Sequence, residues 1–446
     1  MQLKGDRMPF GGAGRGSRPW RILILVTLIA GGILLTRLVE AGRVEPLFLP
    51  TPTPTRTALS HQGEGEAHFA SGDLERSIEA YKQAVRLRPA DAELLAELAR
   101  VQTYSSALIA TAEGERDRLQ EAQDSIDRAV ALSEDSGFAW AVRTLVNDWL
   151  AAAEDDLRLR QKYFTAAEAS ANRALLLRPD SALALAYEAE VDVDQLRYAE
   201  ATDKIQSALD LDSSSMDVHR VHGTVLESNG FYEDAIQAYA KAAQINPNLT
   251  FLYLRMGANY RRLSEMDKAL EYFAKAATIN RQLGIADPIP YWSIGRTYLQ
   301  DGQFFIAARN LESALEISPD NAELLGYLGI IYFKARNYEN AVGTLRCAVD
   351  GCTDAEHARL LCDTLAILNC EDEEQAFRAS GVSGLELGPK SLEYYYTYGS
   401  VLTLDKASCD EAERVFLDLE SSYGTDPIVS AIVLEGRGLC EDETGQ

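Results

Sequence analysis

The sequence predicts an all-α protein in which helical hairpins stack into a superhelical solenoid, preceded by one membrane-spanning helix. Three observations lead to this prediction. From residue 216 the chain repeats itself with a period close to 34 residues. Within each period, large apolar residues recur at steps of three and four, as amphipathic helices require. Near the N-terminus, an uncharged apolar segment follows several basic residues.

The apolar segment, residues 22–36, lies between Arg21 and Arg37. Crossing a membrane takes about 20 residues, and apolar neighbours extend the segment to residues 20–39. Both arginines can keep their charge among lipid headgroups while their stems stay in the apolar layer. We therefore expect residues 20–39 to be a single-pass anchor in the cell membrane.

Basic residues outnumber acidic ones in the tail at residues 1–19. The positive-inside rule then places this tail in the cytoplasm and the repeats outside it. A cleaved signal peptide would show a similar basic and apolar pattern, and would release a secreted protein. Arg37 and Glu40 stand where a cleavage site needs small residues, which favours an uncleaved signal-anchor.

Residues 40–57 form a linker in which proline and threonine alternate as "PTPTPTRT". This composition favours an extended polyproline II rod of about 3.1 Å per residue. Residues 46–57 would then reach about 35 Å, enough to hold the repeats away from the bilayer. The rest of the chain, from residue 57 on, carries a formal charge of −30. A body that acidic repels phosphate backbones, so no nucleic-acid partner is expected.

The repeat is defined by small residues at constant intervals. Gly223, Gly257, Gly295 and Gly329 lie 34, 38 and 34 residues apart, and Ala235, Ala269, Ala307 and Ala341 keep the same intervals. The four extra residues fall in "LGIADPIP", which we expect to be a loop insertion. A break at "LSEM" divides one unit into two amphipathic helices, so each unit is a helical hairpin.

These residues resemble the tetratricopeptide repeat, a family of 34-residue helical hairpins. The pattern is matched by Tyr253, Met256, Gly257, Tyr260, Ala269 and Phe273, and again in the units on either side. The resemblance, to membrane-anchored members of bacterial type, implies a right-handed superhelix that binds protein or peptide partners. We expect nine to ten hairpins over residues 58–440, clearest at 58–91, 182–354 and 391–422, followed by a tail at 441–446.

In this family the first helix of each hairpin lines a concave groove. By position in the repeat, the groove residues expected here are Arg220, Glu227, Phe251, Leu254, Arg261, Trp292, Arg296 and Phe333. Some family members clamp a partner's C-terminal carboxylate with Lys and Asn. The corresponding positions here hold Leu254, Ala258 and Thr224, so that clamp is not expected.

All six cysteines follow residue 346. Cys409 opens one expected helix and Cys440 closes the next, and in an antiparallel pair those two ends meet. We therefore expect a disulfide between Cys409 and Cys440. The pairing of the others stays open, namely Cys347, Cys352, Cys362 and Cys370.

No catalytic motif, cofactor site or metal site is expected. The chain lacks the G-x-S-x-G, H-E-x-x-H and phosphate-loop patterns, and no small-molecule substrate is expected. The preferred hypothesis is a non-catalytic protein–protein interaction scaffold. An assembly or maintenance factor of a cell-envelope machine for secretion, pili or wall synthesis is the alternative, and an enzyme with an unrecognised site in residues 92–170 is the third. The partner, the oligomeric state and the pathway stay open.

Overall fold

The computed structural model describes residues 19–41, 56–368, 380–404 and 408–441. The chain divides into two compact units, Met1–Arg56 and Thr57–Gln446. Most of the expected basic tail and Pro/Thr linker lies outside the described residues. So do Cys370 and residues 442–446 of the expected tail.

The described part of the first unit is the helix α1 (Pro19–Glu40). Its 22 residues rise about 33 Å at 1.5 Å per residue, close to the thickness of a bilayer's hydrocarbon core. Within it, Pro19–Leu38 has a mean hydropathy of 2.0 and no buried side chains. By length and composition, α1 is therefore a candidate membrane span.

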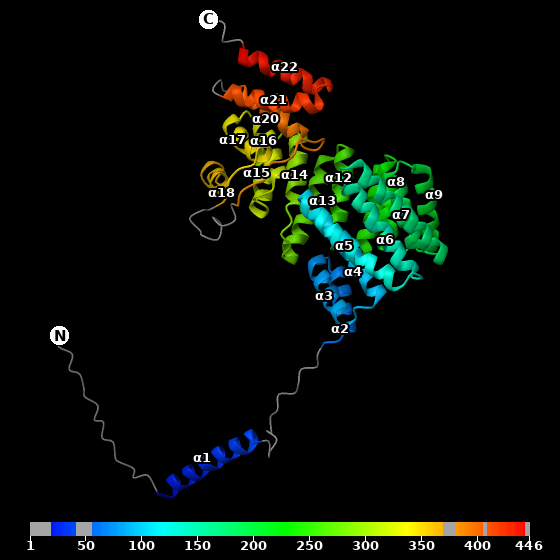
Figure 1. The fold of residues 1–446 in the computed structure, drawn as a ribbon, viewed down its shortest axis with the longest axis vertical. Helices are drawn as coiled ribbons and strands as arrows, with labels where there is room; N and C mark the ends of the chain where they lie inside the picture. The colour runs from blue at the N-terminus through cyan, green and yellow to red at the C-terminus, as the bar shows by residue number, and fades with distance from the viewer. Residues whose placement is uncertain (1–18, 42–55, 369–379, 405–407, 442–446) are drawn as a thin grey trace, which may run out of the picture. The chain divides into compact units, whose positions relative to one another are not determined.

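The second unit is a series of antiparallel helical hairpins, nine of them within the described residues (Figure 1). The hairpins are α2 (Ala58–Ala70) with α3 (Leu74–Leu87), α4 (Ala92–Ser106) with α5 (Ala112–Leu132), α6 (Gly137–Ala153) with α7 (Leu157–Leu177), α8 (Ala182–Asp194) with α9 (Tyr198–Leu211), α10 (Met216–Ser228) with α11 (Tyr232–Ile245), α12 (Thr250–Arg262) with α13 (Met266–Leu283), α14 (Ile289–Gln300) with α15 (Phe304–Ile317), α16 (Ala322–Lys334) with α17 (Tyr338–Val349), and α20 (Leu392–Leu402) with α21 (Cys409–Tyr423). A final helix, α22 (Pro427–Glu441), packs on α21 at the C-terminal end. The predicted all-helical solenoid is confirmed.

Capping residues set where the first helix of many hairpins begins. At the start of α4, the side chain of Asp91 accepts a hydrogen bond from Leu94 N. Ser136, Ser181, Ser215 and Asn321 cap α6, α8, α10 and α16 in the same way. These short polar side chains satisfy backbone N–H groups that the first helical turn leaves without partners.

Glycines let the two helices of a hairpin cross closely. A Cβ added at Gly257 would lie 2.5 Å from Phe273 Cε1, closer than two carbon atoms can pack. The same relation joins Gly65 to Tyr81, Gly223 to Tyr239, Gly295 to Leu311, Gly329 to Leu345 and Gly399 to Phe416. In the Gly257 hairpin the large residue lies 16 positions after its glycine, so the repeat is built from one small and one large residue in direct contact.

The second unit has two main hydrophobic cores. The first runs from Leu74 to Ile279 and the second from Ala307 to Val433. Between them α13 continues to Leu283, and the "LGIADPIP" insertion forms the loop that leads into α14. The Asp287 residue in this loop is only 2% exposed. Its carboxylate accepts hydrogen bonds from Ile289 N at 2.9 Å and from Asn280 Nδ2 at 2.7 Å.

The edges of hairpins far apart in the sequence touch. Asn321 Nδ2, at the start of α16, donates to the Ala110 carbonyl in the α4–α5 connection at 3.2 Å. Lys390, just before α20, makes a second contact of this kind, with its Nζ 3.3 Å from Asp155 Oδ1 in the α6–α7 connection. We call these four residues the closing contact, because they join the second core's hairpins back to the first.

The segment between α17 and α20 departs from the hairpin pattern. Its described parts are the short helix α18 (Asp354–Ala358), a π-helical turn η1 (Arg359–Thr364) and an isolated bridge between Cys352 and Val382. A disulfide joins Cys347, at the end of α17, to Cys352. This disulfide and the bridge fix the irregular segment to the end of the preceding hairpin.

Candidate interaction surface

The first helix of each hairpin, here called the inner helix, faces inner helices of other hairpins. In the first core these faces meet directly. Tyr104 on α4 stacks on Phe251 of α12, with ring centroids 5.7 Å apart. Arg100 Nη1 on α4 lies 3.0 Å from Asp217 Oδ2 on α10, and the Tyr187 hydroxyl donates to the same carboxylate. The protein's own side chains therefore fill this part of the inner face.

Three of the eight expected groove residues lie in this filled interior. Arg220 is 4% exposed and donates two hydrogen bonds, of 2.5 and 2.6 Å, to Glu190. Glu227 is buried and accepts hydrogen bonds from the Tyr239 hydroxyl of its own hairpin and from Asn259 Nδ2 on α12, both at 3.0 Å. Phe251 is buried against Tyr104 as described above. These side chains join hairpins to one another and do not reach a surface that a partner can touch.

Accessible candidates gather on α12, α14 and α16. Arg296 is exposed, and its guanidinium lies 5.9 Å from the Trp292 ring and 5.5 Å from the Tyr327 ring. Trp292 and Tyr327 meet edge to face with centroids 5.9 Å apart. Arg261 on α12 reaches across to α14, where its Nη1 lies 3.5 Å from the Ser293 carbonyl. We call Arg261, Trp292, Arg296 and Tyr327 the arginine–aromatic strip.

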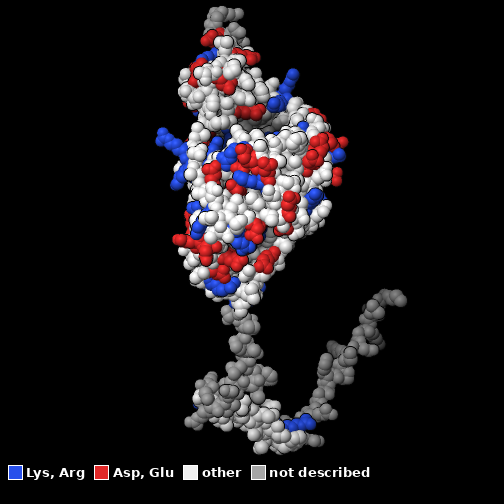
Figure 2. All heavy atoms as spheres, turned by 90° about the vertical axis from the view of Figure 1, so that its right-hand side faces the viewer, with Lys and Arg blue, Asp and Glu red and all other residues white. Residues whose placement is uncertain are grey.

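The two arginines of the strip differ electrostatically from the other charged residues around them. Neither makes an ion pair within the described residues, whereas Arg255 and Arg262 on the same inner helix both approach Glu227. Burial and the neighbouring charge of Arg296 lower the pKa of Arg261 to about 10. On the face shown in Figure 2, acidic and basic side chains are interspersed. The strip thus holds two uncompensated positive charges in a strongly acidic chain.

Leu254 and Phe333 complete the expected set. Leu254 is half-buried and packs on the first core. Phe333 is half-buried at the end of α16, where its ring lies 6.0 Å from the ring of Tyr338 at the start of α17. Leu254 lies on the inner helix next to the strip, while Phe333 packs at the turn of its own hairpin.

Tyr327 was not among the residues expected from the sequence. The repeat position of Trp292 is taken by Gly326 in the next unit. A Cβ at Gly326 would lie 2.8 Å from Tyr394 Cγ on α20, so this glycine lets α20 approach. Tyr327, one residue later, supplies the aromatic ring instead. An aromatic residue beside a glycine at an inner position was the available signal.

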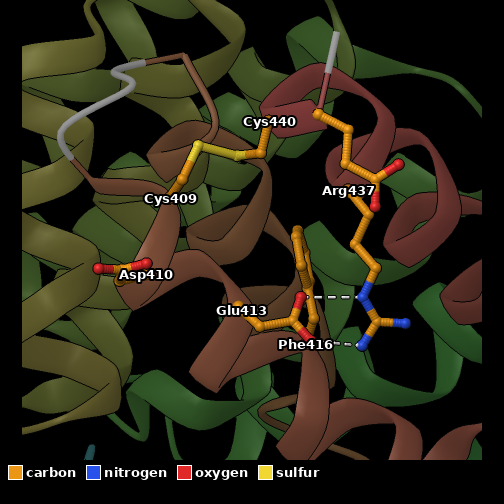
Figure 3. Close-up of a pocket in the computed structure, with 7 residues that line it drawn as sticks. Cys409, Asp410, Glu413, Phe416, Arg437 and Cys440 are labelled. Atoms are coloured by element: carbon orange, nitrogen blue, oxygen red, sulfur yellow. Dashed lines mark hydrogen bonds and ion pairs between the residues drawn. A yellow bond between two sulfur atoms is a disulfide. The ribbon is translucent and has the colours of Figure 1, made fainter. Parts of the chain in front are cut away.

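The C-terminal hairpin is joined to α22 by a disulfide between Cys409 and Cys440 (Figure 3). A cavity of about 310 Å³ lies beside it, lined in part by Phe416 and Arg437. The guanidinium of Arg437 is held by Glu413, at 2.8 and 2.9 Å, and by Glu420 at 2.8 Å. Its charge is already neutralised by these carboxylates, so Arg437 offers no free cation to a ligand in this cavity.

Residues 92–170, the region of the enzyme alternative, contain the carboxyl group of Asp148. Burial and the neighbouring Asp194 raise its pKa well above the usual range. Both Asp148 oxygens lack a hydrogen-bond partner within the described residues, and the residue is 0% exposed. A general acid or base must reach its substrate, and the Asp148 side chain is out of reach.

Family models match several of these hairpins. A model described as "TPR repeat" matches residues 65–102, and one described as "Tetratricopeptide repeat" matches 187–250, 220–283 and 293–356. Together these ranges include most of α4, the inner helices α10, α12 and α16, and three of the four residues of the arginine–aromatic strip, with Trp292 one residue before the last range.

Curated relatives are similar over parts of their length. The BBSome complex member BBS4 of Bos taurus is 30% identical over 112 residues, which is 25% of this chain and 21% of that protein. Anaphase-promoting complex subunit 3 of Schizosaccharomyces pombe is 25% identical over 25% of this chain and 16% of its own. The CTR9 homolog of Arabidopsis thaliana is 22% identical over 64% of this chain and 25% of its own. The chain thus spans a quarter or less of the length of these relatives.

Solved structures that match include a thermophilic TPR protein of Thermus thermophilus, at 19% identity and a TM-score of 0.38, covering 46% of this chain and 98% of that one. The APC/C hetero-tetramer Cut9–Hcn1 matches at 14% identity and a TM-score of 0.40, covering 85% of this chain and 76% of that one. At these scores the matches say nothing about partners.

Proposed function

From the premise that the hairpins of this chain include tetratricopeptide repeats, we propose that it is a non-catalytic scaffold that binds segments of partner proteins. Repeats of this kind generally serve protein–protein interaction, and two relatives are named as members of multiprotein complexes. The observation that carries the proposal is the arginine–aromatic strip. Arginine and tryptophan are the residue types most often found at the energetic centres of protein interfaces.

The second part of the proposal is a membrane tether. α1 is long and apolar enough to span a bilayer, and the basic tail before it favours a cytoplasmic N-terminus. The linker, residues 40–57, then separates the anchor from the solenoid, residues 58–440, on the outer side of the cell membrane. The disulfides Cys347–Cys352 and Cys409–Cys440 support this side, because disulfides persist outside the reducing cytoplasm.

Photo-crosslinking in living cells tests the scaffold. A photoreactive amino acid placed at Gln300, which is exposed on α14 one turn after Arg296, leaves the strip intact and should form discrete adducts with one or a few proteins. The control position is Phe305 on α15, which is 80% exposed and belongs to an outer helix. If Gln300 yields no adduct beyond those obtained at Phe305, the inner face is not a binding surface.

Protease added to intact cells tests the tether and its orientation. The proposed topology predicts that the repeats are digested in intact cells and that a short N-terminal fragment stays protected. Digestion only after cell lysis would show that the repeats lie in the cytoplasm. Recovery of the repeats in the culture medium would show that the N-terminal segment is a cleaved signal peptide rather than an anchor.

A second candidate function is an assembly or maintenance factor of a larger envelope machine. The naming of relatives as complex subunits favours it. The two functions differ in the permanence of the association. A stoichiometric complex that survives purification in detergent supports the assembly factor, whereas adducts seen only by crosslinking support a scaffold with exchanging partners.

A further inference from the structure

We propose that the arginine–aromatic strip binds a carboxylate carried by an extended peptide segment, with a bulky apolar residue beside that carboxylate. This inference rests on the proposed scaffold function and names the chemistry of its partner. The carboxylate is the side chain of an Asp or Glu within that segment. It lies between Arg261 and Arg296, and the apolar residue packs on the rings of Trp292 and Tyr327.

The two positive charges of the strip favour a ligand that carries a carboxylate. Arg220, one hairpin earlier, is paired with Glu190, whereas Arg261 and Arg296 have no ion pair within the described residues. Each positive charge raises the energy of the other. A single anion bound between them would replace this repulsion with two attractive, charge-assisted hydrogen bonds.

Trp292 joins the positive charge to the aromatic surface. The Arg296 guanidinium lies 5.9 Å from the centroid of the Trp292 ring and 5.5 Å from that of the Tyr327 ring. The Trp292 ring is half-buried, so the cation and the exposed part of the ring lie side by side on α14. A carboxylate bound at Arg296 therefore brings its neighbouring residue to these rings.

The rings of the strip favour an apolar neighbour. Trp292 and Tyr327 are both half-buried, so each still exposes part of its ring. Covering this remaining surface with a leucine or phenylalanine side chain of the partner is favourable at about 25 cal/mol per Å².

The net negative charge of the chain disfavours highly anionic ligands, so the bound segment carries few charges. A polyanion such as a nucleic acid meets a chain of net charge −25 and is repelled at long range. A peptide with one carboxylate meets little of this repulsion but gains fully from the two arginines. The partner is therefore a protein segment with an isolated acidic group rather than an acidic tract.

Selection from a peptide library tests the proposal while the natural partner is still unidentified. Random seven-residue peptides displayed on phage are selected on the full-length protein held in detergent micelles. The same selection is run on Arg261→Gln/Arg296→Gln. The matched control is Arg262→Gln/Arg309→Gln, which removes two exposed arginines from α12 and α15 and so makes the same change in net charge.

Peptides enriched on the wild-type protein and on the control should carry an Asp or Glu next to an aromatic or aliphatic residue, and should not be enriched on Arg261→Gln/Arg296→Gln. Synthetic copies of the best peptide, with the acid or with the matching amide, are then titrated by calorimetry. We expect the amide to bind roughly tenfold or more weakly, as the loss of a charge-assisted hydrogen bond implies.

Fluorine NMR of protein labelled with 5-fluorotryptophan identifies the site. The resonance lost in Trp292→Phe should shift on addition of the acidic peptide and stay unchanged with the amide at the same concentration. Peptides without acids, or equal binding by Arg261→Gln/Arg296→Gln, would overturn the carboxylate proposal. If crosslinks at Gln300 are still found in that case, the scaffold function stands and only the ligand chemistry is wrong.

Discussion

Replacing Asp287 with asparagine should stabilise the second unit at neutral pH. Asp287 lies in the loop between the two cores and is almost fully buried. Burial raises its pKa from 3.8 to about 6, because a charged carboxylate is poorly solvated there. Asparagine keeps the shape and an acceptor for the Ile289 N–H group, and it carries no charge.

The size of the effect follows from the pKa. A shift of about two units corresponds to about 3 kcal/mol, since each unit is worth about 1.4 kcal/mol. Between about pH 4 and pH 6 the folded state holds the Asp287 proton that the unfolded state has released. The free energy of unfolding therefore falls as pH rises through this window and is constant, as far as Asp287 is concerned, above it. Below this window Asp287 is protonated in both the folded and the unfolded state, so its burial does not lower the free energy of unfolding there.

Urea unfolding of Thr57–Gln446 at several pH values measures this. The difference in free energy of unfolding between Asp287→Asn and wild type should grow from its value near pH 4 by about 3 kcal/mol on reaching about pH 7.5. Asp267→Asn, at an exposed position on α13, removes the same charge and should show no such growth. A difference that is independent of pH would refute the reasoning, because the variant would then act through packing rather than charge.

Three further predictions concern packing, crosslinking and the closing contact. Gly257→Ala should lower the free energy of unfolding by about 1–3 kcal/mol in a urea titration, because its methyl group overlaps a buried ring; an unchanged midpoint would show that the hairpin can widen. Reduction of the Cys409–Cys440 disulfide should make α21 and α22 exchange amide hydrogens faster while the earlier hairpins stay protected, since closing a loop of this length stabilises by about 3–4 kcal/mol; uniform exchange would contradict it. Lys390→Glu should increase the radius of gyration of Thr57–Gln446 in X-ray scattering by repelling Asp155, and the swapped pair Asp155→Lys/Lys390→Glu should restore it; a radius insensitive to both would mean that the ion pair does not hold the contact.

The fold is predictable because its main determinant is local. Gly257 and Phe273 lie in one hairpin, 16 residues apart, and the same pair recurs along the chain. The residues that determine one hairpin therefore all lie within about 34 residues of sequence. Stacking then follows from the apolar faces that a single hairpin leaves open.

The burial of the expected groove residues depends on distant parts of the chain. Arg220 and Phe251 occupy inner positions, as the repeat pattern indicates. They are hidden because α4, more than 100 residues earlier, packs against α10 and α12 through Tyr104 and Arg100. Each hairpin is rotated slightly relative to the one before it, and these rotations accumulate over several hairpins to set the distance between α4 and α12. The sequence pattern of a single repeat does not specify this accumulated rotation.

Part of the arginine–aromatic strip is predictable from the sequence. Arg261, Trp292 and Arg296 follow from their positions in the repeat, because the inner helix is defined locally. The absence of acidic partners for the two arginines, among the residues that the structure describes, is visible only in three dimensions. It depends on which neighbouring hairpins bring a carboxylate inward, as Glu190 does for Arg220.

The closing contact also determines how a ligand can arrive. Asn321 begins α16, the helix that carries Tyr327, and it is fastened to Ala110 of a much earlier hairpin. A long polypeptide folded at both ends cannot slip sideways past that fastening, but a loose tail can be fed in tip first. Proteins that present a free end should therefore load quickly, and internal loops should load only after the fastening has opened.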